Sequence, residues 1–348
     1  MSSFFLLCYN YYGDSMKKRK KRRLKTSVKL FFLILIVAFI GIHVTKVKYE
    51  EYLYTKTSDY AITNLGYTAE ELNLLNSKLS DNDKWHVAND IGYNEFLINF
   101  VKCKYFLARN IDAYLSLTVD KDEDFWHYKK PEDYNYDELV TKVNVMRHNE
   151  YYTNSVPTDM SKGYGIIANK YHYLGEDYIP DDLVKVEGKY LFSSSNNIQI
   201  RSEVYAAFEE MWKAAKEEEN HYLVIESGFR TYKYQKDIYD DYAKKRGASY
   251  ADSIAARPGY SEHQTGLALD IYSWSCSTAN EFKNTKVYEW LINNSYKYGF
   301  ILRYPENKQN ITGYNFESWH YRYVGKDLAT KVHDSGLTFD EYYAFYLE

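Results

Sequence analysis

Four side chains in two short segments of this sequence have the types and the order that a catalytic metal site requires. His263 lies on a glycine-containing loop and precedes Asp270 by seven positions, and Glu317 precedes His320 by three. A catalytic zinc ion takes three protein ligands of nitrogen or oxygen type and keeps one position open for water. It also needs a base near that water. Two histidines and an aspartate supply such a ligand set, and one carboxylate remains for the base.

Neither segment would establish a site by itself. A single histidine is usually a packed or surface residue, and the chain contains nine. The pattern Pro-Gly-x-Ser-x-His-x-x-Gly-x-Ala-x-Asp, which ends at Asp270, is followed along the chain by Glu-x-Trp-His, which ends at His320. The two patterns in this order are far more specific than any one of their residues.

Together with a third motif, these patterns resemble those of the VanY-type zinc D-alanyl-D-alanine carboxypeptidases, bacterial enzymes of the hedgehog/DD-peptidase fold that trim peptidoglycan stem peptides. The third motif, Glu-Ser-Gly-Phe-Arg-Thr-Tyr-Lys-Tyr-Gln at residues 226–235, is similar to the family's Ser-Gly-Tyr-Arg-Ser-x-x-x-Gln. Phe229 replaces the family's tyrosine and Thr231 its serine, and neither position is a ligand. The resemblance extends over residues 160–335, and the remainder of the chain lies outside it.

The resemblance implies a role for each of five residues. His263, Asp270 and His320 would bind a zinc ion, Zn2+. Glu317 would be the catalytic base. Arg230 would interact with a negative charge on the substrate or in the transition state.

Other residues in the motifs have alternative interpretations. Arg230 could be a surface ion pair, but its place after a Ser-Gly turn at the end of a strand favours a cleft. Gln235 could bind substrate amides or cap the loop, and Ser261 could contact substrate or shape its own loop. We interpret Trp319 as packing beside the metal and Arg322 as the partner of an acidic side chain.

The elements that position these residues predict an α+β fold with a small antiparallel sheet and flanking helices. Apolar side chains at helical spacing predict a helix over residues 200–215. Short apolar runs predict strands, and glycines mark the ends of two further helices. The expected strands are 222–227, 267–272 and 321–324, and the expected helices are 231–245 and 287–298.

The N-terminal region predicts a membrane anchor. A run of Lys and Arg over residues 16–25 precedes an uninterrupted apolar stretch, residues 30–42. A signal peptide would continue with a cleavage site of small residues, and none follows. We therefore expect a cytoplasmic basic tail at 1–27 and a single-pass transmembrane anchor at 28–44, with cleaved export as the alternative. The remainder of the chain would lie outside the cell membrane.

Residues 45–155 predict short helices, including one that begins at the capping-box sequence Thr68-Ala-Glu-Glu. We interpret this region as a helical spacer that precedes the carboxypeptidase domain, residues 156–348. Residues 1–44 contain nine Lys or Arg and one acidic residue, and the rest of the chain carries a net charge of −12. Nucleic acid is therefore not an expected partner, because it binds clustered positive charge.

The sequence thus predicts a membrane-anchored zinc-dependent D-alanyl-D-alanine carboxypeptidase that removes the C-terminal D-Ala of peptidoglycan stem peptides. One alternative is an L,D-carboxypeptidase that acts on tetrapeptide stems with the same residues. Another is a non-catalytic, zinc-containing module that binds the cell wall. The presence of Glu317 argues against the binding module.

Overall fold

The computed structural model describes residues 26–118, 130–192, 197–274, 276 and 279–348. They fall into two units, with the division between Tyr93 and Asn94. The expected basic tail, residues 1–27, lies outside the described residues except for its last two positions.

The first unit begins with a long apolar helix. Helix α2, Thr26–Tyr54, has 29 residues. Within it, Lys29–Tyr54 contains a stretch that is not buried and has a mean hydropathy of 2.4. Because the helical rise is about 1.5 Å per residue, a helix of this length can span the roughly 30 Å apolar core of a bilayer. The helix continues beyond the expected span of residues 28–44.

Short helices complete the first unit. They are α3 (Ser58–Asn64), α4 (Ala69–Asn76), α5 (Asp81–His86) and the π-helix η1 (Val87–Ile91). The Thr68 hydroxyl accepts a hydrogen bond from the Glu71 N–H at 3.3 Å, and the Glu71 carboxylate accepts one from the Thr68 N–H at 2.8 Å. The predicted capping box is therefore confirmed.

The second unit starts with short helices, and the segment between the first two contacts the end of the chain. These are α6 (Glu95–Lys102), α7 (Ile111–Ser116) and α8 (Tyr136–Asn144), with 3-10 turns at Ala108–Asn110 and Pro131–Asp133. The Tyr105 ring stacks on Phe345 at 4.0 Å between centroids, and Arg109 pairs with Glu348 at 3.1 Å. These helices belong to the same compact unit as the sheet. The expected division between a spacer at 45–155 and a carboxypeptidase domain at 156–348 stays a prediction.

A four-stranded antiparallel sheet lies at the centre of the second unit. Its strands are β5 (Leu223–Ser227), β6 (Ala268–Ser273), β7 (Phe300–Leu302) and β8 (His320–Tyr323), in the order β5-β6-β8-β7. Two-stranded pairs form between β1 (Val156–Pro157) and β2 (His172–Tyr173) and between β3 (Leu183–Lys185) and β4 (Gln199–Arg201). The predicted α+β class is confirmed.

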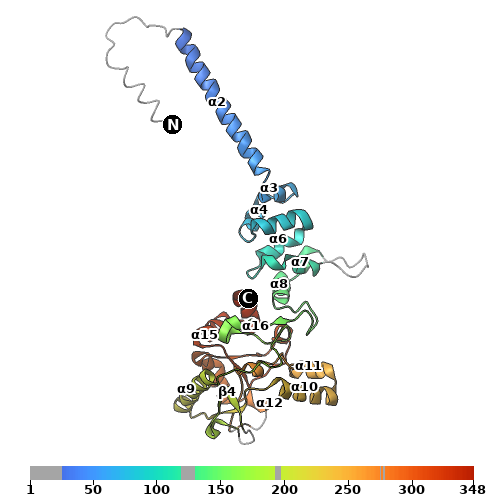
Figure 1. Cartoon of the computed structure of the whole chain (residues 1–348), viewed down its shortest axis with the longest axis vertical. Coiled ribbons are helices and arrows are strands. Elements are labelled where there is room, and N and C mark those ends of the chain that lie inside the picture. The colour runs from blue at the N-terminus through green and yellow to red at the C-terminus, as the bar shows by residue number, and fades with distance from the viewer. Residues whose placement is uncertain (1–25, 119–129, 193–196, 275, 277–278) are drawn as a thin grey trace, which may run out of the picture. The chain divides into compact units, whose positions relative to one another are not determined.

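The second unit contains further helices between and after these strands. They are α9 (Ser202–Glu219), α10 (Tyr232–Arg246), α11 (Ala248–Ile254), α12 (Ala279–Phe282), α13 (Lys286–Asn294), α14 (Gln309–Thr312), α15 (Lys326–Ser335), α16 (Phe339–Tyr342) and the π-helix η9 (Tyr343–Leu347). Helices α10 and α11 pack side by side (Figure 1). The 3-10 turns are η5 (Met160–Gly165), η6 (Gly188–Tyr190), η7 (Glu262–Thr265) and η8 (Ser295–Tyr298). The main core joins one face of α9 to β5, β6 and α13.

Two of the differences from the elements expected from the sequence concern the region around Gly299. The single helix expected at 287–298 is divided into α13 and the separate 3-10 turn η8. This helical segment ends at Gly299, as expected, and Gly299 has the left-handed conformation with φ of 90°. Strand β7 starts directly after Gly299 and was not predicted. Its three residues are too short for a periodic pattern, and pairing with β8 is what makes them a strand.

Candidate metal centre

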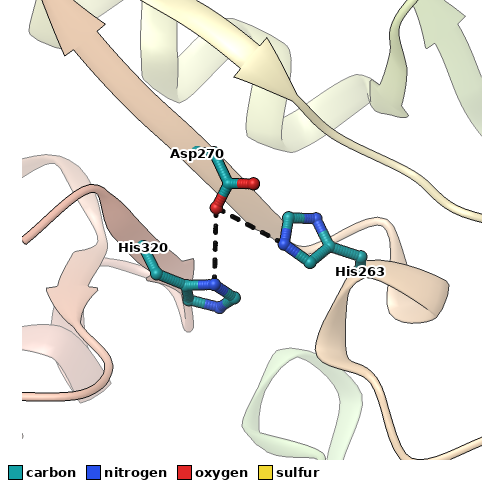
Figure 2. Close-up of side chains that lie close together, drawn as sticks. All are labelled: His263, Asp270 and His320. Atoms are coloured by element: carbon teal, nitrogen blue, oxygen red, sulfur yellow. Dashed lines mark ion pairs between the residues drawn. The ribbon is translucent and has the colours of Figure 1, made fainter. Parts of the chain in front are cut away.

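His263, Asp270 and His320 converge on one point beside the sheet (Figure 2). The Asp270 Oδ1 atom lies 3.5 Å from His263 Nε2 and 3.5 Å from His320 Nδ1. One ligand atom from each residue falls within 4.8 Å of the other two, and all three side chains are buried. The structure thus brings together the three residues that the sequence motifs indicate as ligands.

The sheet and one turn bring the three residues together. Asp270 on β6 and His320 on β8 are directly paired across the antiparallel ladder, so their side chains leave the same face of the sheet. His263 comes from the 3-10 turn η7, which ends at Gly266 with φ of 68°. A Cβ at Gly266 would also lie 2.9 Å from Arg201 Cγ. The glycine therefore serves both the backbone conformation and the packing of the loop.

The donor atoms suit a zinc ion. His263 Nδ1 donates a hydrogen bond to the Gly228 carbonyl oxygen at 2.8 Å, which leaves the lone pair of Nε2 directed at Asp270. Asp270 Oδ1 is buried and accepts no hydrogen bond from any described residue. Two imidazole nitrogens and one carboxylate oxygen are a ligand set typical of catalytic zinc. These residues therefore fit the metal that the sequence motifs predict.

The charges around the ligands favour a cation between them. Burial and the Arg230 charge lower the pKa of His263 to about 4, so its imidazole is neutral at neutral pH, as a metal ligand must be. Burial opposes the charged form of His320. The nearby carboxylates of Asp270 and Glu262 outweigh that effect and raise the pKa of His320 to about 9. A proton and a metal ion therefore compete for this position.

Glu317 lies next to the ligands. Its Oε2 atom is 3.5 Å from His320 Nδ1, and the side chain lines the same cavity as the three ligands. Burial is the main effect that raises the pKa of Glu317 to about 7, Asp270 adds to it, and His320 opposes it. A carboxylate with this pKa can take up and release a proton near neutral pH, which is what general base catalysis needs.

Arg230 contacts a ligand as well as the cavity. Its Nη2 donates to Asp270 Oδ2 at 2.7 Å, and its Nε donates to Ser227 Oγ at 2.9 Å. The guanidinium also lines the cavity. From the sequence, an ion pair and a functional role are alternatives for Arg230, whereas in the structure this arginine pairs with a proposed zinc ligand.

Gln235 and Ser261 both border the cavity. Gln235 is buried, and its Nε2 donates to the Ala256 carbonyl at 2.9 Å, while its Oε1 accepts from Arg230 Nη1 at 3.5 Å. It therefore connects α10 with the loop after α11 and supports Arg230. Ser261 is buried immediately before η7, where it can shape the turn that carries His263.

The cavity has a volume of about 320 Å³ and two different walls. One wall carries the polar groups already described. The other comes from α10, α11 and the residues just after α11, with Ile238, Tyr242, Ile254 and Ala255. We call these four residues the apolar wall, against which small aliphatic groups of a ligand can pack.

Comparison with known proteins gives the family. The family model described as VanY, D-alanyl-D-alanine carboxypeptidase, matches residues 197–326, which include every proposed ligand and Glu317. A relative from Enterococcus gallinarum, the bifunctional D-Ala-D-Ala dipeptidase and D-Ala-D-Ala carboxypeptidase VanXYC, is 32% identical over 183 residues. That match covers 51% of this chain and 93% of the relative. The chain belongs to the VanY family.

Two other proteins are similar to about half of this chain. The YodJ protein of Bacillus subtilis is 44% identical over 182 residues, which cover 51% of this chain and 66% of that protein. The chain therefore spans just under two thirds of the length of this relative. The solved structure of the LdcB LD-carboxypeptidase has 39% identity and a TM-score of 0.52, and covers 56% of this chain and 91% of that one.

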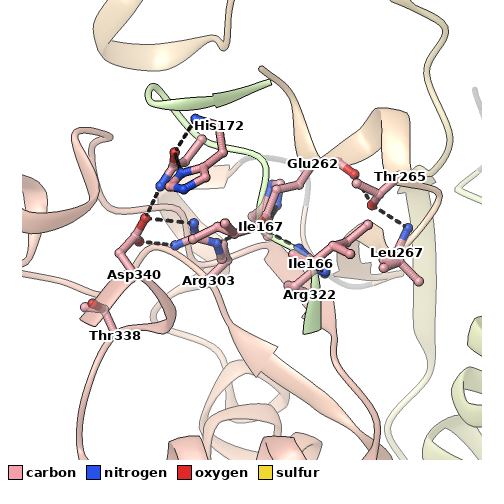
Figure 3. A network of polar contacts seen from close by, with 12 residues as sticks. Ile166, Ile167, His172, Glu262, Thr265, Leu267, Arg303, Arg322, Thr338 and Asp340 are labelled. Carbon is pink, nitrogen blue, oxygen red and sulfur yellow. Dashed lines mark hydrogen bonds and ion pairs between the residues drawn. The ribbon is translucent and has the colours of Figure 1, made fainter. Parts of the chain in front are cut away.

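This VanY-family site also contains a buried charged network that the sequence motifs do not predict (Figure 3). Arg303 Nε and Arg322 Nη1 both donate to Glu262 Oε1, at 2.8 Å and 2.9 Å. The prediction that Arg322 pairs with an acidic residue is confirmed. Glu262 directly precedes His263 within a motif, and this position was the only sequence feature from which a role for Glu262 at the site could have been predicted. Arg303 lies outside every motif, and its role depends on the fold.

We predict that Gly228 cannot carry a side chain without disturbing His263. A Cβ at Gly228 would lie 2.6 Å from Ile200 Cγ2 and 2.7 Å from the Gln199 carbonyl oxygen. Since such overpacking typically costs about 1–3 kcal/mol, Gly228→Ala should lower the melting temperature and weaken zinc binding. Gly188→Ala is the control, because nothing lies within 4 Å of its added Cβ. Equal melting temperatures for the two variants would contradict the prediction.

Proposed function

We propose that this protein is a membrane-anchored, zinc-dependent carboxypeptidase that removes the C-terminal D-Ala of peptidoglycan stem peptides. The observation that carries the proposal is the convergence of His263, Asp270 and His320 beside Glu317 in one cavity. The names of the relatives support the substrate class, since VanXYC acts on D-Ala-D-Ala. An acidic external part agrees with a peptide substrate rather than nucleic acid.

The metal would be held by His263 Nε2, Asp270 Oδ1 and His320 Nδ1. When bound, zinc supplies a Lewis acid for the scissile carbonyl and lowers the pKa of water toward about 7. His263 is kept in the correct tautomer by the Gly228 carbonyl. Asp270 is kept in place by Arg230 through its other oxygen, Oδ2.

Glu317 would transfer a proton from the attacking water to the leaving group. Its carboxylate takes a proton from the attacking water as the water oxygen bonds to the scissile carbonyl carbon. It then gives the proton to the nitrogen of the departing D-Ala as the C–N bond breaks. Arg230 faces the same cavity and can stabilise the developing oxyanion. A donor in that role is typically worth about 100- to 1,000-fold in rate.

A specific observation favours the second candidate, L,D-carboxypeptidase activity. The solved LdcB LD-carboxypeptidase resembles this chain over 91% of its own length. Both activities release D-Ala and differ in the residue that precedes it, so the same metal ligands and base would serve either. The choice depends on the part of the cavity that binds that preceding residue, for which the apolar wall of α10 and α11 is a candidate.

We also propose that α2 anchors the protein in the cell membrane with the basic tail in the cytoplasm and the cavity outside. The apolar helix and the Lys- and Arg-rich segment before it support this orientation. We expect the N-terminus of the mature protein in the membrane fraction to lie before α2. N-terminal sequencing checks this, and a new terminus near residue 45 would instead indicate cleaved export.

The experiment that tests the proposed function is mass spectrometry of muropeptides after incubation with the purified chain. We expect pentapeptide stems to lose one D-Ala in the presence of zinc and to stay intact in the presence of a chelator. Loss of D-Ala from tetrapeptide stems instead would establish the L,D activity. If the protein bound zinc and cleaved neither substrate, the binding-module alternative would replace the enzyme.

A further inference from the structure

Two buried polar atoms face each other behind the proposed metal ligands. His320 Nε2 lies 3.6 Å from Glu262 Oε2. Neither atom has a hydrogen-bond partner elsewhere in the described part of the chain, and the two side chains are 6% and 0% exposed. Buried polar atoms are rarely left without a partner, so the nearest available partner for each is the other.

The position of Glu262 is firmly determined by its second oxygen. Oε1 accepts hydrogen bonds from Arg303 Nε at 2.8 Å and Arg322 Nη1 at 2.9 Å, and the side chains of both arginines are fully buried. Two guanidinium groups hold this carboxylate in its charged form. Oε2 therefore remains a free acceptor that points at His320.

The hydrogen-bond network around Glu262 continues to residues near the C-terminus. These further contacts restrict the movement of the Glu262 side chain. Arg303 also forms hydrogen bonds through Nη1 and Nη2 to Asp340 at the start of α16. Asp340 Oδ1 in turn accepts a hydrogen bond from Asn169 Nδ2 at 2.8 Å, next to β2. Arg322 Nη2 is bound to the carbonyl oxygens of Tyr164 and Ile166. Segments far apart in the sequence thus fix Glu262 behind the ligand.

We propose that Glu262 is a positioning residue that selects the tautomer and the ring orientation of His320. The carboxylate accepts the Nε2–H of His320, so that the lone pair of Nδ1 faces Asp270 and the metal. His263 uses the opposite arrangement, because its Nδ1–H is donated to Gly228 and its Nε2 faces Asp270. Metal-binding histidines generally donate their other N–H to a carboxylate or a backbone carbonyl. Here His320 would use a carboxylate, whereas His263 uses a backbone carbonyl. The inference rests on the proposed zinc site.

The first test uses the unaltered full chain in detergent, labelled with 15N at histidine and loaded with zinc. We expect nitrogen NMR to show His320 protonated at Nε2 and metal-bound through Nδ1, and His263 with the reverse assignment. The two signals are assigned by their loss in His320→Ala and His263→Ala. A zinc-loaded His320 that is protonated at Nδ1 would overturn the proposal.

The second test is zinc affinity, measured by competition with a chromophoric chelator. Loss of a partner of this kind typically costs about 10- to 100-fold in metal affinity, and we expect Glu262→Gln to weaken zinc binding by that amount. The control is Glu341→Gln, a buried glutamate that caps α16 through Thr338 and does not contact His320. This variant should lose stability but keep the zinc affinity of the parent. Equal affinities for the two variants would overturn the proposal.

These outcomes stay separate from those of the proposed function. If Glu262→Gln does not fold, the NMR experiment on the unaltered chain still decides the tautomer. If the chain binds zinc in the predicted tautomers and cleaves no stem peptide, the positioning role stands and the proposed function fails. If the chain binds no zinc at all, both fail.

Discussion

Glu317→Gln should abolish most of the hydrolysis of D-Ala-terminated peptides and leave the metal in place. The amide keeps the size of the side chain but cannot take a proton from water. Since a general base typically contributes about 100- to 10,000-fold, kcat should fall by at least about 100-fold. Glu317 is not one of the three proposed ligands, so the zinc content should stay near one per chain. Steady-state kinetics and metal analysis of the same preparation measure both quantities.

The matched control for this variant is Glu289→Gln on α13. Glu289 is exposed and forms an ion pair with Lys286 at 2.6 Å, so its amide variant should keep the parent's rate. Hydrolysis by Glu317→Gln at nearly the parent's rate would exclude Glu317 as the base. Loss of zinc from Glu317→Gln would instead make it a ligand.

Arg230→Lys should be the second most damaging of the substitutions considered. Lysine retains the positive charge, but it cannot donate to Ser227, Gln235 and Asp270 at once as the planar guanidinium does. If Arg230 also stabilises the oxyanion, kcat/KM should fall by about 100-fold or more at saturating zinc. Asp270 would lose its partner, and zinc binding should weaken as well.

Arg201→Lys is the corresponding control, because Arg201 is a half-buried arginine that pairs with Asp182 at 2.8 Å and does not line the cavity. It should retain kcat/KM within a few-fold. If Arg230→Lys showed weaker zinc binding but an unchanged kcat with the metal restored, the arginine would have only the supporting role toward Asp270. The comparison at saturating zinc therefore separates its two roles.

The site could be predicted largely because its residues lie in contiguous motifs. His263 and Asp270 share one motif, and Glu317 and His320 share another, so the order of the motifs along the chain is enough to indicate the chemistry. Strands β6 and β8 were also expected to within one residue at each end. The register that places Asp270 opposite His320 could not be obtained in this way, because pairing is decided by contacts across the whole sheet.

Most contacts of the supporting residues could not be predicted, because their partners are distant in sequence. Arg303 follows β7, which is too short to recognise, and its role depends on Glu262 and Asp340 being brought to it by folding. Arg230 was expected to face the substrate, and its hydrogen bond to Asp270 joins residues 40 positions apart in the sequence. Local patterns contain no information about such contacts.

The most direct test of the proposed activity is the release of free D-alanine from a synthetic peptide that ends in D-Ala-D-Ala. The full chain should be assayed after loading with zinc, after removal of the metal by a chelator, and after zinc is restored. We predict release of D-alanine by the loaded protein, none after chelation and recovery when zinc is returned. Release that continues undiminished without metal, or no release from any peptide ending in D-Ala by a protein that contains one zinc per chain, would contradict the proposed zinc-dependent mechanism.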